Sequence, residues 1–191
     1  MDGVARLGGL LASVLLIALG IGSAVIGIKG GDDVRDTISE ENIVGTPDMS
    51  PEKITATQGQ EIPDCSVADE EIDTGDEARC FADYLRIHAL EDTGGKTYAE
   101  MPRFLDKQGN PTEDEAAAAI DPKTGAPAEN PERDIWVSAT AFSTALNTSY
   151  FAQQVARFGV AMGIAMVLVG IGFLMLIWFG ALGRRRPVDG A

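Results

Sequence analysis

The chain has 191 residues, a formal net charge of −14 and a mean hydropathy close to zero. Its charges are unevenly placed, because 27 of the 29 Asp and Glu residues but only 10 of the 15 Lys and Arg residues lie between Asp32 and Arg157. The segments on either side are strongly apolar. This separation excludes a soluble single-domain protein, a nucleic-acid-binding protein with a basic face and a large multidomain enzyme.

Two uncharged apolar runs predict two transmembrane helices. The first, Leu7–Ile28, has 22 residues and the second, Phe158–Leu182, has 25, whereas a bilayer core needs roughly 20 residues in helical form. The first run shares features with a secretory signal peptide, with Gly22-Ser23-Ala24 as its cleavage site, but signal h-regions usually have about 7–15 residues. We therefore expect an uncleaved first span, with cleavage as the alternative.

The arginines predict the orientation. Arg184, Arg185 and Arg186 directly follow the second span, whereas only Arg157 adjoins its other end. Lys and Arg close to a span favour its cytoplasmic side. We therefore expect a plasma-membrane protein with residues 1–6 and the basic tail 183–191 in the cytoplasm and residues 29–157 outside it.

Small residues four positions apart predict helix–helix packing in both spans. Gly20 and Ala24 share a face of the first, and Gly159 and Gly163 share a face of the second. Such spacing lets two helix backbones approach closely, within one chain or between copies. The alternative is that these glycines reflect only the general abundance of glycine in membrane helices.

Residues 29–106 are expected to form a helical extracytoplasmic domain. Ser50-Pro51-Glu52 can start a short helix. Thr74 and Glu77 have the spacing of a capping box, which predicts a helix over Asp76–Thr93 that Gly94-Gly95 ends. A second short helix is expected near Thr97–Met101. The core of the domain should be the apolar side of the longer helix, formed by Phe81, Tyr84, Leu85, Ile87 and Ala89 with Cys80 alongside.

The only two cysteines, Cys65 and Cys80, are expected to form a structural disulfide, since the segment is placed outside the cytoplasm. Closing such a loop stabilises the fold by about 3 kcal/mol in the chain-entropy model. A redox-active pair is the less favoured alternative, because it usually has two intervening residues. His88, the only histidine, is expected on the helix surface or in the core.

The second half of the acidic segment divides into two parts. Residues 107–129 are rich in Gly, Pro, Ala and acidic residues and are expected to form a flexible linker, because they can bury little apolar surface. Asn130 and Pro131 then form a cap followed by a first-turn proline. No proline follows before Leu182, which predicts one helix whose extramembrane part is 130–157 and whose membrane part is 158–182.

No motif for metal binding or catalysis stands out, so no cofactor is expected. The acidic run 69–77 is a candidate calcium loop, but with Gly75 at the sixth position Ile72 and Thr74 occupy ligand positions and Phe81 replaces the bidentate Glu. A solvated acidic face is the favoured reading, and weak cation binding is the alternative. The acidic exterior should attract cations or basic partners and repel nucleic acids.

Several short motifs resemble a group of small two-span actinobacterial membrane proteins of unknown function. They are Glu41-Asn42-Ile43, Thr46-Pro47-Asp48-Met49, Cys65-Ser66-Val67-Ala68-Asp69, Ala78-Arg79-Cys80-Phe81, Arg86-Ile87-His88-Ala89-Leu90-Glu91 and Thr93-Gly94-Gly95-Lys96-Thr97-Tyr98. The resemblance covers most of the chain, least well in the linker. Members of the group often carry the label "aromatic ring-opening dioxygenase LigA". That label implies ring cleavage at a non-haem Fe(II) held by two histidines and a carboxylate, and because this chain has one histidine, the activity is not carried over.

These observations predict an all-α membrane protein. Two transmembrane helices flank a helical, loop-rich, disulfide-stapled extracytoplasmic domain, and the second is continuous with a long extramembrane helix. The expected function is non-enzymatic: an accessory or assembly component of a membrane complex, or a self-associating scaffold. Its expected partners are the lipid bilayer and another membrane protein or a second copy. The alternatives are an extracytoplasmic sensor or binding module for a cation or basic ligand and, least favoured, the dioxygenase.

Overall fold

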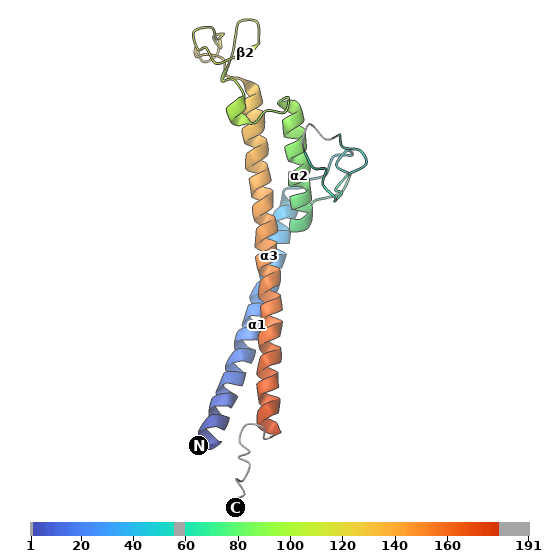
Figure 1. The fold of residues 1–191 in the computed structure, drawn as a ribbon, viewed down its shortest axis with the longest axis vertical. Helices are drawn as coiled ribbons and strands as arrows, with labels where there is room; N and C mark the ends of the chain where they lie inside the picture. Colours follow the sequence, from blue (N-terminus) through green and yellow to red (C-terminus); the bar gives the residue numbers. More distant parts are fainter. Residues whose placement is uncertain (1, 56–59, 180–191) are drawn as a thin grey trace, which may run out of the picture. The chain divides into compact units, whose positions relative to one another are not determined.

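The computed structural model describes residues 2–55 and 60–179, and it is mostly helical (Figure 1). Within these described residues, three α-helices, one 3-10 turn and two very short strands follow one another. In order they are α1 (Asp2–Glu40), α2 (Gly75–Asp92), the 3-10 turn Tyr98–Glu100, β1 (Phe104–Leu105), β2 (Pro111–Thr112) and α3 (Pro131–Trp178). The two long apolar helices, α1 and α3, therefore flank a middle region that contains the Cys65–Cys80 disulfide.

The chain divides into two compact units. The first, here called the two-helix unit, consists of Met1–Val34 and Ala152–Ala191. The second, here called the disulfide unit, is Arg35–Phe151. Each is described by itself below.

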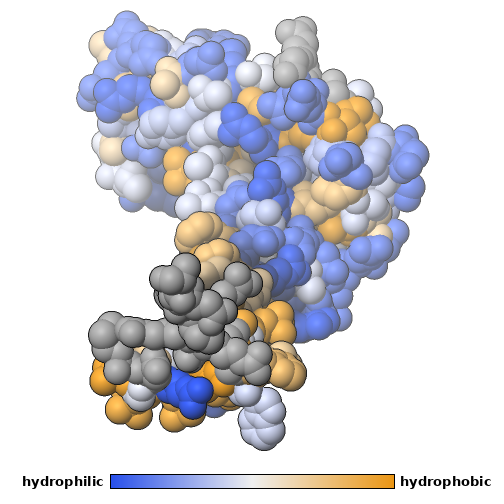
Figure 2. All heavy atoms as spheres, turned by 60° about the horizontal axis from the view of Figure 1, so that its bottom comes forward, coloured by the Kyte–Doolittle hydropathy of each residue, from blue (hydrophilic) through white to orange (hydrophobic). Residues whose placement is uncertain are grey.

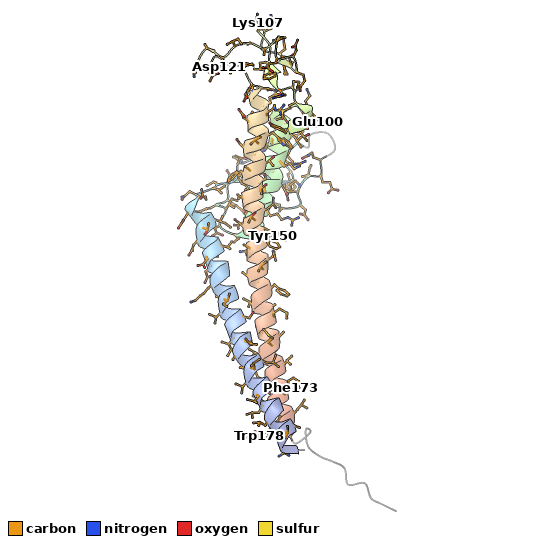
Figure 3. All side chains as sticks on the ribbon, turned by 90° about the vertical axis from the view of Figure 1, so that its left-hand side faces the viewer. Glu100, Lys107, Asp121, Tyr150, Phe173 and Trp178 are labelled. Carbon is orange, nitrogen blue, oxygen red and sulfur yellow. A yellow bond between two sulfur atoms is a disulfide. The ribbon has the colours of Figure 1, made fainter. Side chains whose placement is uncertain are left out.

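Both helices of the two-helix unit are long and apolar enough to cross a membrane. Most of their large apolar side chains are exposed, as are Phe173 and Trp178, which Figure 3 labels on α3. Figure 2 shows hydrophobic residues gathered on this part of the molecule, whereas hydrophilic residues cover most of the remaining visible surface. An exposed apolar surface of this extent is stable only when something other than water covers it.

Helix α1 extends beyond the predicted span, which ended at Ile28. It continues through Gly30 and Gly31 to Glu40 and ends where Asn42 adopts a left-handed conformation (φ 49°). Acidic and glycine residues weaken a helix without forbidding it, and the first proline after the span is Pro47. The apolar run therefore marks the predicted span, whereas the helix itself continues into the polar segment.

The disulfide unit is built around α2, as the sequence predicts. The capping box is present, with the backbone N–H of Glu77 donating to the Thr74 hydroxyl and that of Thr74 to the Glu77 carboxylate. At the other end, Gly94 and Gly95 have positive φ, and the Gly95 N–H donates to the Leu90 carbonyl. Of the expected core side chains only Leu85 is not fully buried. The largest fully buried apolar side chains of the unit are Met49, Val67, Ile72, Tyr84, Ile87 and Met101.

The helix predicted to start at Ser50 is not present. Ser50-Pro51-Glu52 forms one hydrogen-bonded turn, in which Ile54 N–H donates to the Ser50 carbonyl, and residues 51–55 contain no helix. The predicted linker 107–129 contains short pairings, because β2 pairs antiparallel with β1 and three isolated bridges follow. Its acidic residues form local turns: the carboxylate of Asp106 accepts backbone N–H groups of Gln108 and Asn110. Such side chain–backbone bonds order a chain that buries little apolar surface.

The start of α3 matches the prediction. The Asn130 side chain accepts the backbone N–H of Glu132 (3.1 Å), and Pro131 is the first helical residue. The Asn130 amide also donates to the Pro102 carbonyl (3.0 Å), so this fully buried residue ties the helix start to the segment before β1. The short helix predicted near Thr97–Met101 is a 3-10 turn, Tyr98–Glu100, with its own capping box formed by Thr97 and Glu100.

Candidate interaction surfaces

A seam of small residues joins α1 to α3 inside the two-helix unit. The buried small residues are Ser13, Gly20 and Gly27 on α1 and Ala156, Gly163 and Gly170 on α3, and in each helix they are seven residues apart. Gln153 is also buried in this part of α3. The contacts pair early residues of one helix with late residues of the other, so the helices run antiparallel. A seven-residue repeat keeps the same face toward the partner over many turns.

The seam is close enough to bring backbone against backbone. A Cβ atom added at Gly20 would lie 2.6 Å from the carbonyl oxygen of Gly163, and one added at Gly163 would lie 2.5 Å from that of Gly20. At Gly27 it would lie 2.6 Å from the Ala156 carbonyl oxygen. These separations are below van der Waals contact, so no residue larger than glycine fits unless the helices move apart.

The Ser23 hydroxyl donates a hydrogen bond across the seam to the Gly159 carbonyl at 2.9 Å. Gly159 itself is less tightly packed, since a Cβ there would find its nearest neighbour, the Cα of Gly27, at 3.6 Å. The four predicted packing residues all lie at this seam, although their distances to the other helix differ. They are Gly20, Ala24, Gly159 and Gly163. Ser23 and Gly27, the other small-residue pair of the first span, also lie at the seam, whereas the packing role of Gly170 was not predicted.

Other glycines of the two helices lie away from the seam. Nothing lies within 4 Å of a Cβ added at Gly8, Gly22 or Gly172. Together with the exposed large apolar side chains, they form the outward faces of α1 and α3. The arginines Arg184, Arg185 and Arg186, on which the predicted orientation depends, lie outside the described residues.

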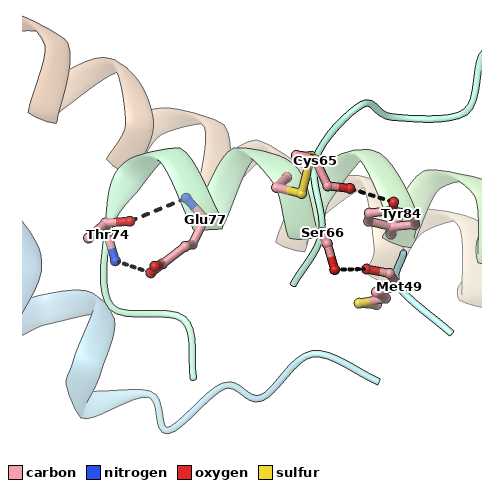
Figure 4. The surroundings of a disulfide bond; sticks show 7 residues. Met49, Cys65, Ser66, Thr74, Glu77 and Tyr84 are labelled. Carbon is pink, nitrogen blue, oxygen red and sulfur yellow. Dashed lines mark hydrogen bonds between the residues drawn. A yellow bond between two sulfur atoms is a disulfide. The ribbon is translucent and has the colours of Figure 1, made fainter. Parts of the chain in front are cut away.

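In the disulfide unit, the Cys65–Cys80 bond attaches a loop to the first half of α2 (Figure 4). The loop is held at two further points: the Tyr84 hydroxyl donates to the Cys65 carbonyl (2.7 Å), and the Val67 N–H donates to the Met49 carbonyl (3.0 Å). Burial raises the pKa of the Tyr84 hydroxyl, which keeps it a neutral donor. The predicted structural disulfide is thus the centre of the small core.

His88 contacts an acidic residue from a distant part of the sequence. Its Nε2 lies 3.0 Å from a carboxylate oxygen of Asp48. The Thr46 hydroxyl bonds the other oxygen (2.5 Å), and this bond, with a smaller contribution from His88, lowers the pKa of Asp48. The pair therefore fastens the turn at Thr46–Asp48 to α2.

Helix α2 packs antiparallel against the first half of α3. The Phe81 and Phe142 rings meet edge to face, with centroids 5.9 Å apart. Two arginines of α2 lie over aromatic rings of α3: Arg79 over Tyr150 at 4.9 Å from the centroid, and Arg86 over Trp136 at 5.3 Å. Contacts of this kind are attractive because the ring face is electron-rich. The long helix thus has support from its own chain.

A groove remains beside this helix pair. It has a volume of about 210 Å³ and is lined by residues of both helices. The α3 wall consists largely of small residues, and the α2 wall carries Asp83 and Arg86. The wall residues used below are Ala139, Thr140, Ser143, Thr144 and Asn147.

The surface of the disulfide unit is strongly acidic. Arg35–Phe151 contains 25 Asp and Glu residues against nine Lys and Arg, a net of −16. Four of those nine cations lie over aromatic rings: Arg79, Arg86, Arg103 and Arg133. Among the described residues, no three His, Cys, Asp or Glu side chains gather in a way that could hold a metal ion. The arrangement offers acidic and apolar surfaces for contact.

Comparisons with known proteins add no family. No protein-family model matches the sequence, and none of the curated proteins or solved structures compared with it matches either.

Proposed function

We propose that the chain is an integral membrane protein of the plasma membrane with α1 and α3 as its two spans. The orientation follows from Arg184, Arg185 and Arg186, which keep both termini in the cytoplasm and residues 29–157 outside it. The disulfide supports this side, because such bonds persist in oxidising compartments. The two-span arrangement is the one shared with the actinobacterial group that the sequence resembles.

The function that these surfaces support best is protein–protein interaction without catalysis, as an accessory or assembly component of a membrane complex or as a scaffold of several copies. The observation that carries it is the exposed small-residue face of α3. The Thr144 hydroxyl donates to the Thr140 carbonyl (2.7 Å), and the Thr148 hydroxyl to the Thr144 carbonyl (2.8 Å). Because these donors are satisfied within the helix, a partner can cover this face without stranding them.

Native sizing tests this proposal. Tagged protein is extracted from its own membrane in a mild detergent, sized under native conditions, and its companions are quantified by mass spectrometry. A companion or a second copy at a fixed ratio is the expected result. A monodisperse single chain, under extraction conditions that keep a known membrane complex intact, would contradict it.

The second candidate is a sensor or binding module for a cation or basic ligand, which the net charge of −16 favours. It predicts saturable binding of calcium or of a polyamine to the purified protein, measured by calorimetry at physiological salt. Binding that disappears as salt rises would be only counterion screening. The third and least favoured candidate function is the ring-opening dioxygenase of the label. Iron bound in a stoichiometric amount to the purified protein would support that function.

A further inference from the structure

The groove between α2 and α3 runs along both helices. Its α3 wall runs from Trp136 to Asn147, about three helical turns. Along it, Ala139 and Ser143, and likewise Thr140 and Thr144, are four residues apart, which places each pair on one face of the helix. Small residues at this spacing let a second helix come close.

Three hydrogen-bond donors of the α3 wall already have partners in the protein. The Asn147 amide donates to the Ser143 carbonyl (2.9 Å), and the Thr144 hydroxyl donates to that of Thr140. The Ser143 hydroxyl reaches the Ala82 carbonyl of α2 (3.5 Å). Removing water from these three donors therefore costs little.

The charge at the groove identifies the kind of helix that fits. Asp83 lies on the α2 wall, one turn from Arg79 and nearly one turn from Arg86. Both of these guanidinium groups lie over α3 rings, and within the described part of the chain Asp83 has no cation within 4 Å. Desolvation raises the pKa of Asp83, and the charge of Arg79 offsets only part of this shift, so a further cation from a partner would stabilise the carboxylate.

From this geometry we propose that the α2–α3 groove binds a helix of another membrane protein, one whose facing side combines small residues with a Lys or Arg placed against Asp83. The inference rests on the proposed function and names its surface and partner. The net charge of −16 decides between a partner and a second copy, because two disulfide units would repel each other whereas a basic helix is attracted.

Site-specific photocrosslinking in the native membrane tests the proposal. A benzophenone amino acid replaces Thr140 or Thr144 in the groove and, as matched controls on the same helix, Ser138 or Ala145, which do not line it. The crosslinked peptides are sequenced by mass spectrometry. We expect one dominant adduct from the groove positions, at least tenfold above the controls, to a helical segment that contains Lys or Arg.

Charge reversal shows whether Asp83 selects that partner. Asp83→Lys should reduce the adduct at least tenfold. Glu91→Lys, with the same change in net charge at an exposed α2 position outside the groove, should leave it unchanged. Retention of the disulfide and of the melting temperature shows that both variants fold.

Three results would overturn the inference: an adduct between two copies of this chain, equal crosslinking at groove and control positions, or an adduct insensitive to Asp83→Lys. A companion seen by native sizing together with no groove adduct would refute the groove and leave the proposed function standing. The absence of both the companion and the adduct would refute both.

Discussion

Substituting a seam glycine tests the packing of α1 against α3. In Gly163→Ala, the new methyl carbon would lie 2.5 Å from the Gly20 carbonyl oxygen and 2.7 Å from the Ala24 backbone nitrogen. Both contacts are with backbone, so the helices themselves must separate. Overpacking of this kind destabilises by about 1–3 kcal/mol, against a gain of roughly 1 kcal/mol because alanine is the better helix former.

Gly172→Ala is the matched control, because the same change on the same helix meets nothing within 4 Å. The difference between the variants cancels the helix-propensity term and leaves the contact alone, about 1–3 kcal/mol. Gly159→Ala should resemble the control, because its nearest neighbour would lie at 3.6 Å.

The assay is equilibrium unfolding of the purified full chain in mixed micelles as the mole fraction of sodium dodecyl sulfate rises, followed by tryptophan fluorescence. The seam predicts the order Gly172→Ala, Gly159→Ala, then Gly163→Ala, from most to least stable. Equal midpoints for Gly163→Ala and Gly172→Ala would refute the backbone contact at this position.

Three further changes act on the disulfide unit. Reducing its disulfide should lower the free energy of unfolding by about 3 kcal/mol, and an unchanged thermal transition after reduction would contradict this. Gly45→Ala should prevent folding of the unit, because the added carbon would lie 1.7 Å from the Val67 carbonyl oxygen; native-like near-ultraviolet circular dichroism in this variant would show that the approach is not that close. The depressed pKa of Asp48 stabilises the fold above the ordinary pKa of 3.8, and this contribution is lost as pH falls through the folded-state pKa. Thr46→Val should therefore be less stable than wild type near pH 6 and equal to it below both pKa values; a difference that persists at the lowest pH would assign the effect to packing.

Short-range signals predicted the helix ends well. Thr74 with Glu77, Gly94 with Gly95, and Asn130 with Pro131 act on backbone groups within a few residues, so their geometry depends little on the rest of the chain. The disulfide was predictable because the chain has only two cysteines, Cys65 and Cys80, so only one pairing within the chain is possible.

Polar composition left the local structure of two segments undecided. The apolar run ends at Ile28, and only the structure shows that α1 continues through Gly30 and Gly31 to Glu40. In the predicted linker 107–129 and just before it, the carboxylates of Asp106 and Asp121 each accept nearby backbone N–H groups. In both segments the low apolar content indicated exposure and did not specify the conformation.

The interaction surfaces were partly visible in the sequence. Four-residue spacing predicted Gly20, Gly27 and Gly163, and only the structure shows that the buried repeat is seven residues and includes Gly170. Local sequence patterns do not predict the pairing of His88 with Asp48 or the groove beside Asp83, because both bring together residues that are far apart in the sequence. Such contacts depend on how α2 and its loops pack.

Protease protection in intact cells tests the central claim most directly. With epitope tags at both ends, trypsin added outside should cleave the exposed cationic sites of the disulfide unit, such as Lys96 and Lys123. Two membrane-embedded fragments should then remain, each with its tag protected until the cells are permeabilised. Loss of either tag in intact cells, or resistance of the whole chain until permeabilisation, would contradict a two-span protein with an outer disulfide unit.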